Sequence, residues 1–209
     1  MCKAEERGEI IVYILYHVNS FKFIFLVTFM KYGTMSYLNC DKGILMLKKI
    51  ERENDPNSGY CTLPGGKLEN CEKGGDSLEG RVKSVIRETK DETGITLINP
   101  ILRGTILFDN KDRTFDNWSN SDNYLVYVYS ATEYKGKLRT SDEGVPFWVS
   151  SWKELDSLPK NPGDKKMYEW LKDGRNFSGV IKHKGKEIDE DGTWVDYFLS
   201  RVNLSSYKI

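Results

Sequence analysis

The sequence carries no excess of charge of either sign. Lysine and arginine together number 31, as do aspartate and glutamate, so the formal net charge at pH 7 is zero. A protein that binds nucleic acid in general needs a basic surplus to neutralise the phosphates. The balanced composition therefore argues against a nucleic-acid binder, although it places no restriction on a single nucleotide as substrate.

Cysteine is scarce, and its few residues form no C-x-x-C pair. The four positions are Cys2, Cys40, Cys61 and Cys71. This spacing favours free thiols in a reducing compartment over a disulfide framework or a redox motif. We therefore expect a cytoplasmic protein. Internal repeats and low-complexity segments are also missing from the sequence.

No hydrophobic run is long and clean enough to be read directly as a membrane span. The stretch Ile10–Phe29 is strongly apolar, but His17, Asn19, Ser20 and Lys22 interrupt its centre. A membrane helix needs about 20 predominantly apolar residues without a central charge. A signal peptide is disfavoured because no small-residue cleavage site follows. Membrane association is thus the less favoured interpretation.

Residues 1–29 are predicted to form an apolar extension, followed by the functional domain at 30–209. The two apolar halves, 10–16 and 21–29, are rich in β-branched and aromatic residues, which favours a hairpin of strands. An exposed apolar segment of this length would otherwise be an interaction patch. We expect the extension to add strands to the fold or to mediate self-association. Membrane anchoring is the alternative.

The most informative feature is a cluster of three carboxylates within five residues. In a helix, Glu88 lies three residues before Asp91 and four before Glu92, so the three side chains are neighbours. Like charges so close repel, and each raises the pKa of the others. A cation relieves that repulsion, and hard oxygen ligands at this spacing suit Mg²⁺, with Mn²⁺ as a second candidate. The alternative is an acidic helix face that is merely solvated.

The residues flanking the cluster favour the metal site over the solvated face. Gly65 and Gly66 precede the helix and leave room for backbone groups to approach a metal or a phosphate. Glu79 lies two turns before Arg87, on roughly the same side of the helix. Gly94 is placed to end the helix in the left-handed conformation. The unit is therefore a glycine loop, a helix with an acidic face, and a glycine stop.

These residues resemble the Nudix box, G-x5-E-x7-R-E-U-x-E-E-x-G-U, the signature of the Nudix hydrolases. The matching positions are Gly66, Glu79, Arg87, Glu88, Thr89, Asp91, Glu92, Gly94 and Ile95. The chain departs from the signature at three places. Twelve residues separate Gly66 from Glu79 because the loop 70–78 carries an insertion, Thr89 replaces an aliphatic residue, and Asp91 replaces a glutamate.

The resemblance implies a fold, a cofactor and a set of roles. It implies the α/β fold of the family, an α/β/α sandwich with a mixed sheet, and hydrolysis of a nucleoside diphosphate linked to another group. The implied metal ligands are the carbonyl of Gly66 and the carboxylates of Glu88, Asp91, Glu92 and Glu143. Glu88 or Glu92 would accept the proton of the attacking water. Arg87 would orient Glu79 or Glu88 through a bidentate contact.

Periodicity gives a coarse map that agrees with an α/β domain. The strands expected are 34–38, 43–49, 101–108, 124–134, 146–149 and 180–183, and the helices are 78–93, 152–158 and 165–172. The apolar residues Leu78, Val82, Val85 and Ile86 are predicted on the side of the first helix opposite the carboxylates. The run 124–129 is apolar throughout, which is typical of a strand buried on both faces.

A second acidic position lies in the stretch 141–148, SDEGVPFW. A carboxylate beside a glycine, just before a strand led by proline, lies on a loop of the kind that carries function. Read alone, the stretch is an ordinary polar turn. It also resembles the E-G-x-P-x-W segment of MutT-type 8-oxo-dGTP diphosphatases, where the glutamate is a metal ligand. That resemblance is the basis for including Glu143 in the metal site.

The substrate end rests on four further residues. Asp164 matches a base-recognition aspartate of the MutT-type group, while Asn161 stands where that group often has a tryptophan. Asp164 could equally cap a helix that begins at Lys165. Lys49 and Gly65 are predicted to lie near the phosphates, although a solvated strand end is the alternative for Lys49.

The predicted activity is Mg²⁺-dependent cleavage of a purine nucleoside triphosphate such as 8-oxo-dGTP to the monophosphate and pyrophosphate. The alternatives are cleavage of another nucleoside-diphosphate conjugate and a sensor that binds nucleotide without turnover. Thr89, Asp91 and the insertion motivate the sensor. In each case the expected partner is a small nucleotide rather than a nucleic acid.

Overall fold

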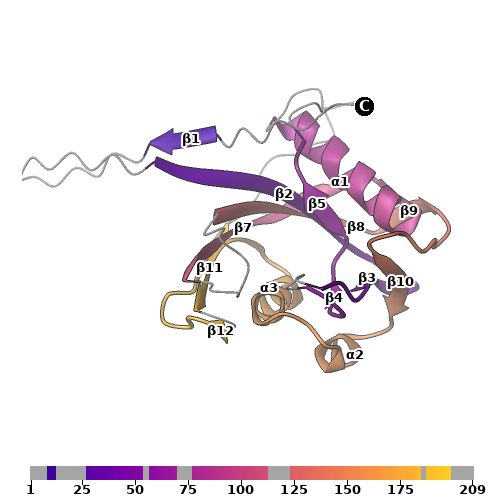
Figure 1. Ribbon diagram of the computed structural model, residues 1–209. Helices are drawn as coiled ribbons and strands as arrows, with labels where there is room; N and C mark the ends of the chain where they lie inside the picture. Colours follow the sequence, from indigo (N-terminus) through magenta and orange to yellow (C-terminus); the bar gives the residue numbers. More distant parts are fainter. Residues whose placement is uncertain are drawn as a thin grey trace, which may run out of the picture.

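A computed structural model describes residues 9–12, 27–53, 57–69, 77–112, 123–184 and 187–198. Most strands join one large mixed sheet, whose central order is β10-β3-β2-β8-β7-β11-β12. β2 pairs in parallel with β8, and β7 pairs in parallel with β11, while the other ladders are antiparallel. The predicted mixed sheet is therefore confirmed (Figure 1).

The strands follow one another along the chain with bounds that agree broadly with the sequence pattern. Their ranges are β1 Glu9–Val12, β2 Val27–Cys40, β3 Gly43–Lys49, β4 Cys61–Thr62, β5 Gly65–Lys67, β6 Ile95–Ile98, β7 Ile101–Asp112, β8 Asn123–Ala131, β9 Glu133–Gly136, β10 Gly144–Val149, β11 Asn176–Lys184, β12 Glu187–Ile188 and β13 Trp194–Phe198. β4 and β5 extend from β3 and β2, and β13 pairs with β11. β6 and β9 form a separate two-stranded sheet.

Helices cover both faces of the sheet, as the sandwich prediction requires. α1 (Leu78–Thr93) lies on one face, and α2 (Trp152–Ser157) and α3 (Pro162–Asp173) lie on the other (Figure 1). Alternate residues of β8 divide the core between these layers. Val126 and Val128 join the cluster that holds Leu155 and Trp170, whereas Tyr127 and Tyr129 belong to the cluster of Val85. The α/β/α arrangement is therefore confirmed.

The strand predicted at 124–134 is wrong in one respect. The chain bends at Thr132, so β8 ends at Ala131 and a separate strand, β9, begins at Glu133. β9 leaves the large sheet and pairs with β6, with Glu133 opposite Ile98. The apolar pattern alone could not show this change of partner. The predicted burial of the run is confirmed at Val126–Tyr129.

The start of the last predicted helix is also wrong. α3 begins at Pro162, three residues before the predicted start, and Asn161 occupies the N-cap position without a side-chain capping bond. Proline suits the first helical position because its missing N–H has no partner there in any case. Asp164 therefore lies inside the first turn and does not cap the helix.

The N-terminal segment is described only at its two ends. Residues 9–12 pair antiparallel with 27–30, as a hairpin of strands requires, while residues 13–26 lie outside the described ranges. β2 then continues without a break across the predicted boundary at residue 30. β1 and the beginning of β2 extend away from the body of the sheet (Figure 1). Within the described ranges, no helix has the length and apolarity to cross a membrane.

Candidate active site

The acidic helix α1 is bounded by local signals that the sequence displays. The side chain of Ser77 accepts a hydrogen bond from the backbone N–H of Gly80 at the N-terminus. At the C-terminus Gly94 adopts φ 78°, and its N–H donates to the carbonyl of Lys90. The predicted range 78–93 is confirmed. The helix therefore presents a fixed face to β5 and β2.

The buried side of α1 is more polar than predicted. Leu78 is exposed, whereas Ser84, Thr89 and Thr93 are fully buried. The hydroxyl of Thr89 donates to the carbonyl of Val85 at 2.7 Å, so this buried hydroxyl has a hydrogen-bond partner. The departure from an aliphatic residue at Thr89 is therefore accommodated within the helix itself.

The glycine pair lets the helix carboxylates lie against the sheet. A Cβ on Gly66 would lie 2.5 Å from the carboxyl carbon of Glu88, and a Cβ on Gly65 would lie 2.8 Å from Cα of Met35. The N–H of Gly65 donates to Oε2 of Glu92 at 2.8 Å. Absence of a side chain at both positions is therefore a condition for the observed approach.

Glu88 and Glu92 are the carboxylates that face the interior. Glu92 is only 4% exposed, and burial raises its pKa above the ordinary value despite the opposing effect of Lys49 and Gly65. Burial likewise raises the pKa of Glu88, although Arg87 opposes the shift. The guanidinium of Arg87 lies 2.8 Å from Oε1 of Glu88. Arg87 thus contacts Glu88, the second of its two predicted partners.

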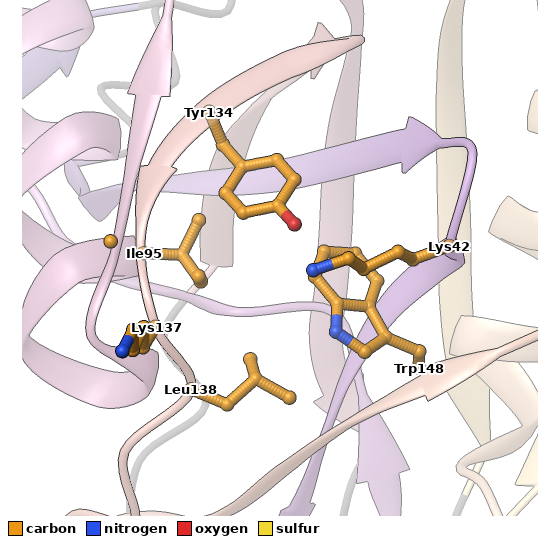
Figure 2. Close-up of a pocket in the computed structure, with 7 residues that line it drawn as sticks. Lys42, Ile95, Tyr134, Lys137, Leu138 and Trp148 are labelled. Atoms are coloured by element: carbon orange, nitrogen blue, oxygen red, sulfur yellow. The ribbon is translucent and has the colours of Figure 1, made fainter.

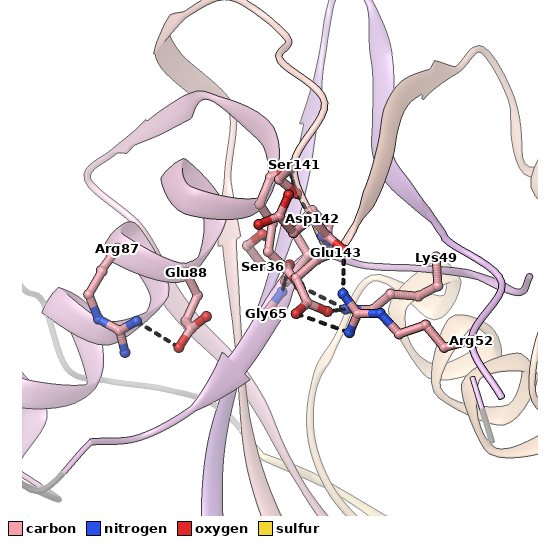
Figure 3. Close-up of polar contacts among 11 residues, drawn as sticks. Ser36, Lys49, Arg52, Gly65, Arg87, Glu88, Ser141, Asp142 and Glu143 are labelled. Carbon is pink, nitrogen blue, oxygen red and sulfur yellow. Dashed lines mark hydrogen bonds and ion pairs between the residues drawn. The ribbon is translucent and has the colours of Figure 1, made fainter. Parts of the chain in front are cut away.

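Glu143 reaches the same place from the loop before β10. Gly144 pairs with Lys49 across the β10–β3 ladder, which brings residues far apart in the chain together. Nζ of Lys49 lies 3.1 Å from Oε2 of Glu143 (Figure 3). It also lies 2.9 Å from Oε1 of Glu92. Burial alone would lower the pKa of Lys49, but the two carboxylates hold it above its ordinary value.

Arg52 also contacts Glu143, and the sequence pattern gave no reason to select it. Its Nη1 lies 3.4 Å from Oε1 of Glu143, and its Nη2 donates to the carbonyl of Asp142 (Figure 3). Partial burial would raise the pKa of Glu143, but Lys49 and Arg52 outweigh that effect and lower it. The signal that could have identified Arg52 is its position three residues after Lys49, in the loop that leaves the same strand.

The loop that carries Glu143 is attached to the helix as well. The hydroxyl of Ser141 donates to the backbone carbonyl of Glu92 at 2.9 Å and accepts from the N–H of Glu143 at 3.3 Å. The same side chain therefore ties the end of α1 to the loop. The stretch 141–144 is a structured connection between helix and sheet rather than a freely solvated turn.

Two predicted site residues are largely exposed to solvent. The side chain of Asp91 is 64% exposed, with Arg87 at 4.0 Å, and that of Glu79 is 71% exposed and forms an ion pair with Lys83. The structure thus connects a set of residues that we call the acidic group: Glu88, Glu92, Glu143, Lys49, Gly65, Gly66 and Arg87. It leaves Asp91 and Glu79 on the solvent side of α1.

Asn161 and Asp164 lie with α3, on the face of the sheet opposite α1. Asp164 is buried, with 8% of its surface exposed, and Nδ2 of Asn161 donates to Oδ1 of Asn57 at 2.5 Å. The loop that contains Asn57 also contains Arg52, whose N–H donates to Ser58. One loop therefore contacts both the acidic group and the predicted base-binding end.

The donor set fits a hard divalent cation in kind. Glu88, Glu92 and Glu143 offer carboxylate oxygens, which Mg²⁺ and Mn²⁺ prefer. In the described part of the chain, however, no three acidic, histidine or cysteine side chains are gathered closely enough to hold a metal as they stand. The ammonium of Lys49 and the guanidinium of Arg87 lie against these carboxylates and neutralise them.

A separate cavity of about 240 Å³ lies just beyond the C-terminus of α1, and none of the predicted site residues lines it (Figure 2). It is lined by Lys42, Ile95, Tyr134, Gly136, Lys137, Leu138 and Trp148. Nζ of Lys42 lies 5.5 Å from the centroid of the Tyr134 ring, and the rings of Tyr134 and Trp148 are 5.4 Å apart. The cavity is a feature of the β6–β9 sheet and not part of the acidic group.

The chain matches known proteins over most of its length. A sequence model of the NUDIX domain matches residues 33–171. A protein of Bacillus subtilis (strain 168), described as the uncharacterized Nudix hydrolase YvcI, is 30% identical over 154 residues, which cover 72% of this chain and 85% of that protein.

Solved structures show the same fold. A MutT protein from Bacillus halodurans superposes with a TM-score of 0.61 at 27% identity, covering 79% of this chain and 97% of that one. The NUDIX domain of Shewanella oneidensis NrtR, solved with ADP ribose, gives a TM-score of 0.51 at 16% identity and covers 76% and 93%, a likeness of fold alone. These matches and the box residues on α1 show that the chain belongs to the Nudix hydrolases, enzymes that act on phosphoric anhydrides of small nucleotide-derived compounds and generally use divalent metal ions.

Proposed function

We propose that the chain hydrolyses a purine nucleoside triphosphate, with 8-oxo-dGTP the first candidate, to the monophosphate and pyrophosphate in the presence of Mg²⁺. The observation that carries the proposal is the placement of Glu88 and Glu92 against the glycine pair, with Lys49 linking Glu92 to Glu143. Three carboxylates from α1 and the β10 loop would hold the metal, together with the Gly66 carbonyl and Asp91. When bound, the metal would neutralise phosphate charge and lower the pKa of a water molecule.

Glu88 is the better candidate to accept the proton of the attacking water. Both oxygens of Glu92 already accept protein donors, from Lys49 and from Gly65. In Glu88, Arg87 engages Oε1, and the other oxygen lies against Gly66. Water would add to one phosphorus of the α–β anhydride, its proton would pass to Glu88, and the bond from that phosphorus to the bridging oxygen would break, which leaves the monophosphate and pyrophosphate. Arg87 would orient Glu88 throughout, while exposed Glu79 would act only at a distance.

Purine selection is assigned to the α3 end. Asp164 is a buried carboxyl, and Asn161 is held by a loop that also reaches the acidic group through Arg52. A buried carboxyl can read a purine edge by hydrogen bonding. Lys49 and Gly65 would lie near the phosphates. The cytoplasm is the proposed location, which agrees with the free thiols of Cys40 and Cys61.

The test is a substrate panel with product analysis. It should include normal and oxidised purine triphosphates, sugar nucleotides, dinucleoside polyphosphates, and ADP-ribose, the compound bound in the NrtR structure. We expect triphosphates to give pyrophosphate. If ADP-ribose or another diphosphate conjugate is preferred by more than about tenfold, or 1.4 kcal/mol, the substrate class is wrong while the reaction class survives.

A folded Glu92→Gln variant tests the acidic group itself. We expect its turnover to fall by at least about a hundredfold, the scale on which positioned acid–base and electrostatic groups contribute. Glu133→Gln on β9 is the matched control, because Glu133 is exposed and remote from the acidic group. Full activity of Glu92→Gln would refute the hydrolase proposal. Tight nucleotide binding without any product, with Mg²⁺ or Mn²⁺, would favour the sensor.

A further inference from the structure

The oxygens of two predicted metal ligands are already engaged by protein donors. Oε1 of Glu92 pairs with Lys49, and its Oε2 accepts from the N–H of Gly65. Oε2 of Glu143 pairs with the same ammonium of Lys49, and its Oε1 pairs with Arg52. One ammonium therefore bridges carboxylates from two different elements, in the position that a metal ion shared by them would need.

The fold places Lys49 in this position by strand geometry. Lys49 ends β3 directly opposite Gly144, so the neighbouring Glu143 lies beside it. The side chain of Lys49 is only 16% exposed, whereas Lys48 points to the other face and is exposed. The two carboxylates would repel each other without a cation between them. Lys49 thus has a specific partner set rather than the environment of a solvated strand end.

We propose that Lys49 is a resident counter-cation that holds Glu92 and Glu143 in place and withdraws when a divalent metal binds, while Arg52 keeps hold of Glu143. The inference rests on the proposed function, because it concerns the metal of that site. An ammonium and a divalent ion repel each other at contact distance, so both cannot occupy the same position. Lysine suits the role because its charge sits on a flexible four-carbon chain, whereas the guanidinium of arginine is a rigid fork.

The first readout is metal affinity without nucleotide. Mg²⁺ and Mn²⁺ are titrated calorimetrically into the wild-type protein, Lys49→Met and the matched control Lys48→Met at mildly alkaline pH, where the carboxylates stay ionised. Removing the competing ammonium should tighten metal binding by about tenfold or more, the scale of close charge pairs. The Lys48→Met control should bind the metal with the wild-type affinity.

The second readout is thermal unfolding in EDTA and in excess Mg²⁺. In EDTA, Lys49→Met should melt at least about 4 °C lower than the wild type, because buried Glu92 loses its charged partner. Excess Mg²⁺ should remove this difference in melting temperature. If Lys49→Met does not fold, Lys49→Gln keeps a hydrogen-bond donor without the charge and should still tighten metal binding.

Two results would overturn the proposal. The first is that both Lys49 variants bind the metal no more tightly than the wild type does. The second is that Lys49→Met loses stability in EDTA and Mg²⁺ does not restore it. The failure of the hydrolase proposal looks different: metal affinity would respond to Lys49, yet no nucleotide would yield product. Conversely, product formation with equal metal affinity in all variants would refute only the counter-cation.

Discussion

Gly66→Ala should separate activity from stability. A Cβ at residue 66 would collide with the carboxyl group of Glu88, with 2.8 Å to Oε1, and no other atom of the described residues would lie so close to it. That carboxyl group is the far end of a flexible side chain, so Glu88 would move and the backbone would stay. The movement costs about 0.5–1.5 kcal/mol of rotamer strain, and the lower entropy of the unfolded chain offsets about 0.4–1 kcal/mol. Net stability should therefore change by less than about 1 kcal/mol.

The neighbouring substitution Gly65→Ala is the matched control with the opposite expectation. Here a Cβ would meet the carbonyl oxygen of Thr34 and lie 2.8 Å from Cα of Met35, so β5 must separate from β2. Overpacking against backbone costs about 1–3 kcal/mol. For a chain of this length, a loss of about 2 kcal/mol lowers the melting temperature by roughly 4–8 °C.

The assay combines thermal unfolding with steady-state hydrolysis of the preferred nucleotide. Displacement of Glu88 by about 1 Å should lower the turnover of Gly66→Ala by about a hundredfold, since catalysis depends on such positioning. Its melting temperature should stay within a few degrees of the wild type, and Gly65→Ala should show the larger loss of stability. Full activity of Gly66→Ala, or a larger loss of stability in Gly66→Ala than in Gly65→Ala, would refute the placement of Glu88 against the glycine pair.

Three other substitutions or truncations test the surrounding fold. Gly94→Ala should cost about 1–3 kcal/mol more in urea unfolding than Gly174→Ala, because both adopt positive φ but only residue 94 faces a backbone carbonyl; equal costs would contradict this packing. Thr89→Val should change stability by less than about 1 kcal/mol and retain activity, since the hydrogen bond that is lost joins two residues of the same helix. A chain beginning at Met30 should remain folded and active, because the β2–β8 ladder starts at the Met30–Asn123 pair. Size-exclusion chromatography of this chain beside the full one tests self-association through residues 10–29, and a folded but inactive short chain would place the extension in the site.

Local signals predicted α1 correctly, whereas the ends of other elements depended on tertiary partners. The range 78–93 was predicted from a helical apolar spacing and the terminal glycine, and the structure adds a capping serine at residue 77; all these signals lie in or beside the segment. The break at Thr132 arises because β9 finds its partner in β6, which lies more than thirty residues earlier in the chain. A continuous apolar run contains no information about which sheet each half will join.

The acidic group was predictable in its members but not in its geometry. Spacing rules place Glu88, Asp91 and Glu92 near one another, but adjacent helix residues differ by about 100° in direction. Only Glu92 of the last two can face β5, and Asp91 is consequently exposed. The sequence could not decide this, because the rotation of α1 about its axis is fixed by packing of Val85 against the sheet.

The pairing of Lys49 with Glu143 shows what sequence spacing cannot supply. The two residues are 94 positions apart, and they meet only because Gly144 stands opposite Lys49 in the β10–β3 register. A slip of one residue in that ladder would turn Lys49 toward α3 and bring Lys48 to the acidic group, since alternate strand residues face opposite sides. The register of β3 therefore decides which of the two lysines meets Glu92 and Glu143, and the ion pairs of Lys49 depend on it.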